Sequence, residues 1–374
     1  MTSIKDIIGN VYEGKKVLVT GHTGFKGSWL VVLLKELGAE VIGISLEPNT
    51  SPNLFDSLKL STKMKSYIQD IRKFNSIKEI LEKEKPEIVF HLAAQPIVRE
   101  SYENPTYTYE TNVIGTANIL EAIRKTDSVK AVVMITTDKV YKDKKWVWPY
   151  RENDELGGYD PYSSSKACAE IIINSYIQSF FNTEDYGIKH KVLVASARAG
   201  NVIGGGDWSR DRLIPDIVRA IYEKNEKVVL RNPSHVRPWQ NIFDCLFGYL
   251  LLGKMLDLGK KEFVGSWNFS PNDEAFINVE ELVKKGIGVL GCGEYVVKKD
   301  EGKHETEILK LDSTKAKNFL KWRPALNIDE SLRFTFDWYR NYYKREADIY
   351  ACTLTQIQEY INYLKMGVGK SDEI

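Results

Sequence analysis

Short apolar runs alternate with longer amphipathic segments through the first half of the chain. The β-branched runs predict strands, and apolar residues at helical spacing predict the helices between them. Strands joined through helices run parallel, and continuously apolar strands are buried on both faces. The pattern therefore predicts an α/β fold with a Rossmann-like, doubly wound parallel sheet. The predicted strands cover 16–20, 40–46, 87–93, 130–136 and 190–198, and the predicted helices cover 27–38, 75–86, 111–125 and 162–180.

The alternation breaks after about residue 200. A stretch rich in glycine and charge, "GGGDWSRDR", precedes a predicted helix over 214–224 and a short strand over 227–230. The apolar helix predicted over 242–256 is typical of a return to the first unit. We expect one domain from residues 1–200 plus about 238–258, a smaller mixed α/β lobe from 201–237 and 259–345, and a C-terminal helix and tail over 346–374.

Composition excludes several classes of protein. Lys plus Arg number 52 and Asp plus Glu number 51, so the net charge of +1 gives no general attraction to nucleic acid or acidic membranes. No apolar run reaches the roughly 18 residues of a membrane span, and the start lacks the pattern of a signal peptide. The four cysteines form no CxxC pair, which indicates reduced thiols in a cytoplasmic protein. We expect no metal site.

The stretch "VTGHTGFKGSWL" places Gly21, Gly24 and Gly27 between the first predicted strand and helix. The first glycine allows a tight turn, the second lets backbone approach a pyrophosphate, and the third lets the helix pack on the strand. The phosphates would then meet the helix N-terminus. The spacing is GxxGxxG rather than GxGxxG, and a purely structural turn is the alternative. In this setting the loop predicts a dinucleotide-binding domain.

Further cofactor contacts are expected where strands end. Ser45 stands where an acid usually binds the adenosine ribose, with Glu47 two residues later. No arginine closely follows Ser45 to receive a 2′-phosphate, which favours NAD over NADP. Plain strand ends are the alternative reading. The expected cofactor-binding residues are Gly21, Thr23, Gly24, Phe25, Gly27, Ser45, Asp70, Ile71, Leu92, Ala93, Ala94, Gln95, Asn112, Tyr162 and Lys166.

Tyr162 and Lys166 lie four residues apart in "DPYSSSKACAE", so a helix presents both on one face. A phenol with a pKa near 10 is a poor base at neutral pH. A nearby ammonium and a positive nicotinamide ring are expected to lower that pKa and to suit removal of a hydroxyl proton. A surface helix pair is the alternative.

The chain resembles the extended short-chain dehydrogenase/reductase family, which includes nucleotide-sugar epimerases and dehydratases. The resemblance rests on the glycine loop, "HLAAQ", "YETNVIGT", "TTDKVY", "YSSSKACAE" and "RAGNVIGGGDW". More narrowly, "YDPYSSSKACAE", "GNVIGGGDWSRDRLIPD", "RPWQNIFD" and "LKLDSTKAKNFLKWRP" are similar to CDP-glucose 4,6-dehydratases. The resemblance implies an NAD-binding domain, a nucleotide-sugar-binding lobe and a role in deoxysugar biosynthesis, such as that of lipopolysaccharide O-antigen.

The resemblance also implies a reaction. Tyr162 takes the C4 hydroxyl proton as hydride passes to NAD⁺, water is lost across C5 and C6, and hydride returns to C6. CDP-D-glucose thereby becomes CDP-4-keto-6-deoxy-D-glucose. Carried over by position, the catalytic residues are Thr137, Asp138, Lys139, Tyr162 and Lys166.

Asp138 suits the acid that protonates the leaving hydroxyl if burial raises its pKa, and Lys139 suits the C5 base only if it is neutral. Many dTDP-glucose and GDP-mannose dehydratases resemble Thr-Asp-Glu or Ser-Ser-Glu here instead. The Asp-Lys pair is shared with CDP-glucose dehydratases and with inverting UDP-N-acetylglucosamine dehydratases. A surface ion pair on a loop is the alternative.

The expected substrate-binding residues are Asn201, Arg212, Leu213, Arg231 and Arg237, because arginine forks suit a diphosphate. His304 and Glu305 stand where dTDP-glucose relatives place arginines, so the choice of CDP rests on resemblance. Other nucleotide-sugar 4,6-dehydratases acting on UDP-N-acetylglucosamine or dTDP-glucose, a C4 epimerase and a non-catalytic NAD-sensing protein remain alternatives. The resemblance also implies a homodimer or homotetramer.

Overall fold

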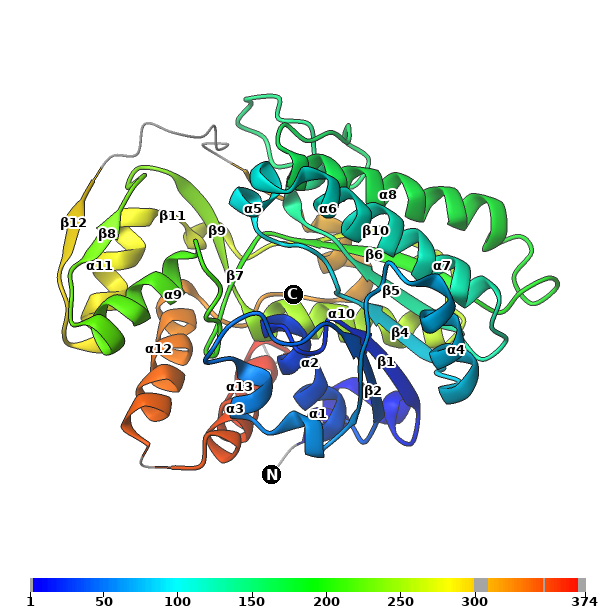
Figure 1. Ribbon diagram of the computed structural model, residues 1–374, viewed down its shortest axis with the longest axis horizontal. Helices are drawn as coiled ribbons and strands as arrows, with labels where there is room; N and C mark the ends of the chain where they lie inside the picture. The colour runs from blue at the N-terminus through cyan, green and yellow to red at the C-terminus, as the bar shows by residue number, and fades with distance from the viewer. Residues whose placement is uncertain (1–2, 299–308, 346, 369–374) are drawn as a thin grey trace.

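The computed structural model describes residues 3–298, 309–345 and 347–368. A parallel sheet of seven strands runs through this described part (Figure 1), in the order β10-β6-β5-β4-β1-β2-β3. The predicted α/β fold with a doubly wound parallel sheet is confirmed. Its strands are β1 (Lys16–Thr20), β2 (Glu40–Ser45), β3 (Lys65–Ile68), β4 (Ile88–His91), β5 (Ala131–Ile135), β6 (Leu193–Ala199) and β10 (Gly265–Phe269).

Both faces of this sheet are buried. In β1, Val17 and Val19 join one core cluster while Leu18, between them, joins the other, and all three side chains are fully buried. Such alternation explains why the strands must be apolar at every position. Helices α4 (Phe74–Glu84), α7 (Gly115–Arg124) and α8 (Pro161–Phe180) cover one face, and α2 (Phe25–Glu36) and α10 (Ile242–Asp257) cover the other.

Two helices begin with clear local signals. Helix α8 has Pro161 in its first turn, and the Asp160 side chain caps it by accepting a hydrogen bond from Ser163 N at 2.9 Å. The helix predicted over 111–125 is longer than expected, because a turn opened by Pro105 leads into it. The segment comprises α6 (Pro105–Tyr109), a π-helical stretch (Glu110–Ile114) and α7.

Shorter elements complete the first domain. They are α1 (Ile4–Ile8), α3 (Leu54–Ser57), α5 (Val98–Glu103) and the 3-10 turns Asn10–Tyr12, Leu60–Thr62, Asp138–Val140 and Lys261–Phe263.

A smaller lobe adjoins the carboxyl end of β6, because β7 (Asn201–Ile203) follows β6 after a single residue. It contains a sheet in the order β11-β9-β7 and a two-stranded sheet, β12-β8. Its strands are β8 (Val228–Leu230), β9 (Val236–Asn241), β11 (Phe276–Asn278) and β12 (Tyr295–Val297). Its helices are α9 (Leu213–Val218), the π-helical Arg219–Lys224, α11 (Val279–Leu290) and α12 (Ile328–Lys344), with a 3-10 turn at Asp273–Ala275. The π-helical stretch Ala316–Leu320 instead packs on α10 and β10 of the first domain.

One strand within 259–345 lies outside the lobe where we expected that segment. β10 pairs in parallel with β6 at the edge of the large sheet, and its Trp267 and Phe269 are buried there. Five residues, "GSWNF", carry too little pattern to identify a pairing partner, so only the tertiary packing assigns this strand.

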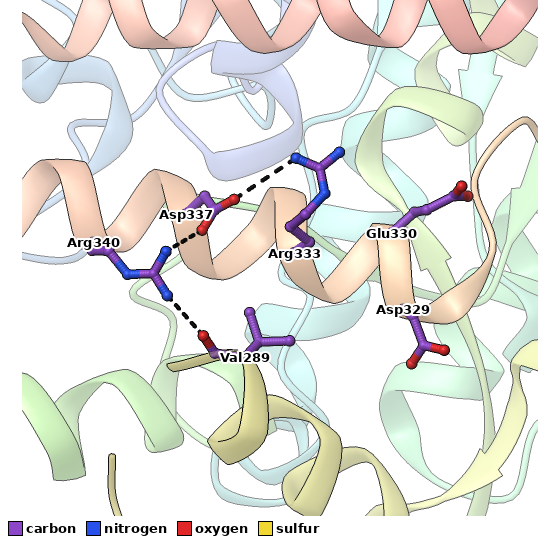
Figure 2. Close-up of a pocket in the computed structure, with 6 residues that line it drawn as sticks. All are labelled: Val289, Asp329, Glu330, Arg333, Asp337 and Arg340. Atoms are coloured by element: carbon purple, nitrogen blue, oxygen red, sulfur yellow. Dashed lines mark hydrogen bonds and ion pairs between the residues drawn. The ribbon is translucent and has the colours of Figure 1, made fainter. Parts of the chain in front are cut away.

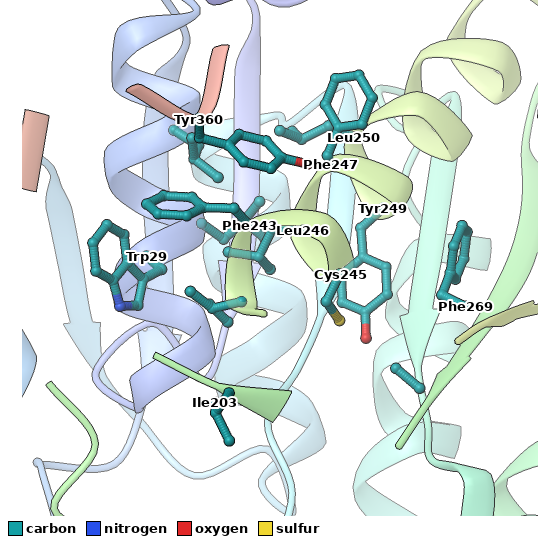
Figure 3. Packing of buried hydrophobic residues seen from close by; sticks show 14 of the residues in the cluster. Trp29, Ile203, Phe243, Cys245, Leu246, Phe247, Tyr249, Leu250, Phe269 and Tyr360 are labelled. Atoms are coloured by element: carbon teal, nitrogen blue, oxygen red, sulfur yellow. The ribbon is translucent and has the colours of Figure 1, made fainter. Parts of the chain in front are cut away.

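The C-terminal helix α13 (Ile349–Val368) packs on α12 and on the start of α10. Tyr360 stacks on Phe243, and Phe243 in turn meets Trp29 of α2 edge to face (Figure 3). These aromatic contacts connect the end of the chain to the helix that follows the glycine loop. In the part of the chain that the structure describes, none of the helices is long and apolar enough to cross a membrane.

Candidate active site

The glycine loop joins β1 to α2 with no space for side chains at two of its glycines. Gly21 has a φ of +74°, and a Cβ there would lie 2.8 Å from the backbone N of Ala93. A Cβ at Gly27 would lie 2.0 Å from the carbonyl oxygen of Gly21. Gly24, the N-cap of α2, is exposed. The loop therefore offers bare backbone and a helix N-terminus, which fit a dinucleotide pyrophosphate.

The predicted adenosine contacts lie at the ends of β2 and β3. The Ser45 hydroxyl lies 2.7 Å from the hydroxyl of Thr23, so these two candidates contact each other. Asp70 pairs with Arg72 at 2.6 Å, and Ile71 is buried. The carboxylate of Asp70 is thus engaged by its own chain, whereas Ser45 and Thr23 form a small hydroxyl pair beside the glycine loop.

The segment after β4 is held by side chains rather than left free. Asn112 Oδ1 accepts a hydrogen bond from Gln95 N at 2.8 Å, and Asn112 Nδ2 donates to Ser165 Oγ of α8 at 2.9 Å. Gln95 and Asn112 are buried, so they shape the loop, whereas Leu92, Ala93 and Ala94 remain partly exposed beside the glycine loop.

The five candidate catalytic residues come from two neighbouring elements. Strand β5 ends at Ile135, and Thr137 caps the 3-10 turn Asp138–Val140, donating to Asp138 Oδ1 at 2.8 Å. On α8, Lys166 Nζ donates to the carbonyl of Ile135 at 3.4 Å. Tyr162 and Asp138 are both buried, and Lys139 is partly exposed.

Burial dominates the protonation of this group. It raises the pKa of Asp138 above its ordinary value, against the opposing charges of Lys139, Arg237 and Lys26. Burial, helped by the charge of Lys26, lowers the pKa of Lys166 to about 8. The site therefore contains an acid that resists ionisation and a lysine that releases its proton more readily than usual.

Burial dominates the pKa of Tyr162 in the protein alone. We predicted that a nearby ammonium and a nicotinamide ring would lower it, but burial raises it to about 12 in the protein alone. The hydrogen bond with Thr137 and the charge of Arg212 act in the opposite direction without overcoming burial. Loss of water from around the phenol thus outweighs the charges that the chain supplies.

The predicted substrate residues lie in the lobe, and two of the arginines influence the catalytic group. The charge of Arg212 lowers the pKa of Tyr162, and the charge of Arg237 lowers that of Asp138. Arg231 instead pairs with Asp211 at 3.2 Å. Asn201 begins β7 and Leu213 begins α9, both partly exposed. His304 and Glu305 lie outside the described residues.

The sequence matches the family model described as "GDP-mannose 4,6 dehydratase" over residues 18–335. The protein belongs to this family. The predicted resemblance to extended short-chain dehydrogenases/reductases is therefore confirmed.

Two relatives are similar to this chain over most of its length. The CDP-glucose 4,6-dehydratase of Salmonella typhimurium is 46% identical over 354 residues, covering 94% of this chain and 98% of that protein. The UDP-glucuronate 4-epimerase of Thermodesulfobacterium geofontis is 29% identical, over 86% of this chain and 95% of that protein. Among solved structures, UDP-glucose 4-epimerase of Thermotoga maritima with UDP-glucose has a TM-score of 0.75 at 25% identity, over 87% of this chain and 99% of the other.

The sequence reasoning missed two cations in this dehydratase-family site. Lys26 stands in the first turn of α2, within "GFKG", and its charge influences both Asp138 and Lys166. Arg99 of α5 pairs with Asp211 of the lobe at 3.5 Å. A lysine inside a glycine loop was a visible signal for the first, whereas only the tertiary structure brings Arg99 to the lobe.

A shallow hollow between α11 and α12 lies apart from these residues (Figure 2). Its two arginines, Arg333 and Arg340, both pair with Asp337 of the same helix. Arg333 also pairs with Glu359 of α13, and Arg340 also donates to the carbonyl of Val289 on α11, so both guanidinium groups are engaged by the chain itself.

Proposed function

We propose that the protein is a CDP-glucose 4,6-dehydratase that converts CDP-D-glucose to CDP-4-keto-6-deoxy-D-glucose and water. The observation that carries the proposal is a buried Asp138, next to Lys139, on a turn beside Tyr162. The identity of 46% with the Salmonella typhimurium CDP-glucose 4,6-dehydratase, over nearly the whole length of both chains, supports the choice of nucleotide.

The glycine loop, Thr23 and Ser45 would hold NAD, with Leu92, Ala93 and Ala94 along its path. When bound, NAD would supply the reversible oxidation of the sugar at C4. We infer NAD rather than NADP because Ser45 and Thr23 bond to each other and Glu47 follows, with no arginine directly after them.

Tyr162 takes the proton from the C4 hydroxyl. Because its pKa is about 12 in the protein alone, the phenolate needs positive charge nearby, and Lys166 is the group on the same helix face that supplies it. The hydrogen bond with Thr137 also lowers the pKa of Tyr162. The pair thus serves as the acid–base group of the oxidation step.

Asp138 and Lys139 serve the loss of water. Burial keeps the Asp138 carboxyl protonated to higher pH than usual, so it can give its proton to the departing C6 hydroxyl. Lys139, the neighbouring and more exposed residue, is placed on the same turn to take the C5 proton. The 3-10 turn lets consecutive residues serve one substrate, which an extended strand would not allow.

Arg212 and Arg237 would bind the sugar diphosphate, since their charges already act on Tyr162 and Asp138. Arg231 is more exposed and pairs with Asp211, and it would contact the same diphosphate. Asn201 and Leu213 would line the path between the two domains.

A C4 epimerase is the alternative suggested by relatives such as the Thermodesulfobacterium geofontis protein. Epimerisation has no need of a buried acid next to a lysine, so Asp138 and Lys139 favour dehydration. A non-catalytic NAD-binding protein would likewise have no need of Tyr162.

Incubation with CDP-glucose, dTDP-glucose and UDP-N-acetylglucosamine in parallel tests the proposal. We expect a 4-keto-6-deoxy product, which absorbs in the near ultraviolet in alkali, from CDP-glucose in preference to the other two. Tyr162→Phe should abolish it. No keto product from any of the three, with NAD bound, would refute dehydratase activity, and interconversion at C4 alone would identify an epimerase.

We also propose a homodimer built on α7 and α8. Ile114, at the end of the π-helical stretch before α7, and Ile171 and Phe180 of α8 are large apolar residues exposed by 45 to 57%. A homotetramer would need a second surface. The four free cysteines support a cytoplasmic location.

A further inference from the structure

Glu170 follows Lys166 by one helical turn on the buried face of α8, and its side chain is only 2% exposed. Its two carboxylate oxygens accept hydrogen bonds from residues of different segments. Oε1 accepts from the hydroxyl of Thr136, directly after β5, and Oε2 accepts from Ser196 Oγ of β6 at 2.8 Å. The carboxylate thus connects the catalytic helix to the strand end that leads into the catalytic turn.

Arg198 of β6 completes the connection from the other side. Its Nη2 donates to Glu170 Oε2 at 2.7 Å, and its Nη1 donates to the hydroxyl of Tyr141 at 2.8 Å. Thr136 precedes the segment 137–140 and Tyr141 follows it. The Glu170–Arg198 pair therefore contacts the residues on both sides of the turn that carries Asp138.

The pair is charged as well as buried. Burial alone would raise the pKa of Glu170, but the Arg198 guanidinium holds it below the ordinary value, so the carboxylate is ionised. Charged groups on neighbouring elements act on Lys166. The charge of Glu170 on α8 raises the pKa of Lys166, and the charge of Lys26 on α2 lowers it. The charge of Lys166 in turn lowers the pKa of His91 on β4.

A buried ion pair contributes little net stability, because both charges lose their water. The presence of the Glu170–Arg198 pair is therefore better explained by the geometry that it imposes on the catalytic turn than by a gain in stability. We propose that Glu170 is a positioning residue: its carboxylate, held by Arg198, fixes the Asp138 turn against the helix of Tyr162 and Lys166 and places a negative charge near Lys166. The proposal rests on the proposed dehydratase function for its catalytic consequence.

Three variants separate these roles. Thr136→Val removes one hydrogen bond to Glu170 and keeps the charge, and Glu170→Gln removes the charge. Ser196→Ala is the matched control, because it removes a hydrogen bond to the same carboxylate away from the catalytic turn. With CDP-glucose in a single turnover, we expect Glu170→Gln and Thr136→Val to slow water loss at least about tenfold more than C4 oxidation. Ser196→Ala should leave the ratio of the two steps unchanged.

A second measurement needs no substrate. Mass spectrometry can follow the reaction of Lys166 with an amine-acylating reagent across a range of pH. The midpoint, the pH at which Lys166 is half-reactive, should be lower in Glu170→Gln than in the wild type, because the charge of Glu170 raises the pKa of Lys166. The midpoint should not move in Thr136→Val or Ser196→Ala.

The outcomes distinguish this proposal from the function itself. A wild-type protein that forms no product from any nucleotide sugar overturns the function, and an unchanged Lys166 midpoint in Glu170→Gln then overturns the role of Glu170. If the wild type is active, the comparison of Thr136→Val with Ser196→Ala decides the role of Glu170. A purely structural role would slow C4 oxidation and water loss equally in both variants and lower the Tm of both. Thr136→Val decides the point even if Glu170→Gln fails to fold.

Discussion

Gly200 packs directly against the carboxylate of Asp138. A Cβ at Gly200 would lie 3.1 Å from Asp138 Oδ2 and 2.7 Å from Cγ of Pro238. Gly200 follows β6 and Asp138 follows β5, so neighbouring strands bring them together. The absence of a side chain at Gly200 therefore leaves the buried acid its space.

Gly200→Ala is expected to lower turnover of CDP-glucose by about 10- to 100-fold, because a displaced acid is poorly aligned with the leaving group. C4 oxidation should suffer less than water loss. Gly288→Ala is a suitable control, since a Cβ at Gly288 would contact nothing within 4 Å. Equal effects of the two substitutions on the water-loss step would contradict this account.

Asp138→Asn is expected to permit C4 oxidation and to slow water loss by about 10²- to 10⁴-fold, the usual range for a general acid. Reduced cofactor and 4-keto sugar should accumulate, and stopped-flow absorbance would detect them.

The wild type provides the matching pH test. Because burial raises the pKa of Asp138, its proton is retained at low pH and lost as pH rises through the raised value. The water-loss rate should therefore fall on the alkaline side of that value, and Asp138→Asn should lack this decline. An identical pH profile in the variant would assign the acid to another group.

Gly27→Ala is expected to weaken NAD binding by at least about tenfold, or some 1.4 kcal/mol, and to lower Tm. The added Cβ would lie 2.0 Å from a backbone oxygen of Gly21, so the loop itself must move. Calorimetric titration with NAD measures the loss. If affinity stayed within a factor of two of wild type, about 0.4 kcal/mol, the glycine loop would not be the phosphate site.

Asp244 gives a prediction about stability. It is buried at the start of α10, where Oδ1 accepts hydrogen bonds from Ala325 N at 2.7 Å and from the Tyr360 hydroxyl at 2.9 Å. Burial raises its pKa from 3.8 to about 7. A carboxyl with a raised folded-state pKa contributes its stabilisation at low pH and loses it as pH rises through that value.

Asp244→Asn keeps the Oδ1 acceptor and cannot ionise. The Tm of the variant relative to wild type should therefore increase as pH rises from about 4 to about 7. Asp127→Asn, at an exposed position, serves as the control. A constant difference in Tm across this range would show that Asp244 does not titrate there.

The spacing of nearby residues in the sequence determined the dinucleotide loop and the pairing of Tyr162 with Lys166. A strand, glycines at fixed intervals and a helix sufficed to predict the dinucleotide loop, since turn geometry and helix start are properties of adjacent residues. Tyr162 and Lys166 share a helix face for the same reason, because four residues make about one turn.

Tertiary structure decided what depends on residues far apart in the chain. Three contacts join separate segments of the chain. They are the pairing of β10 with β6, the contact of Gly200 with Asp138, and the bonds of Glu170 with Thr136 and Arg198. The raised pKa of Tyr162 in the protein alone has the same origin. Burial depends on everything that packs around a group, and no spacing along the sequence records it.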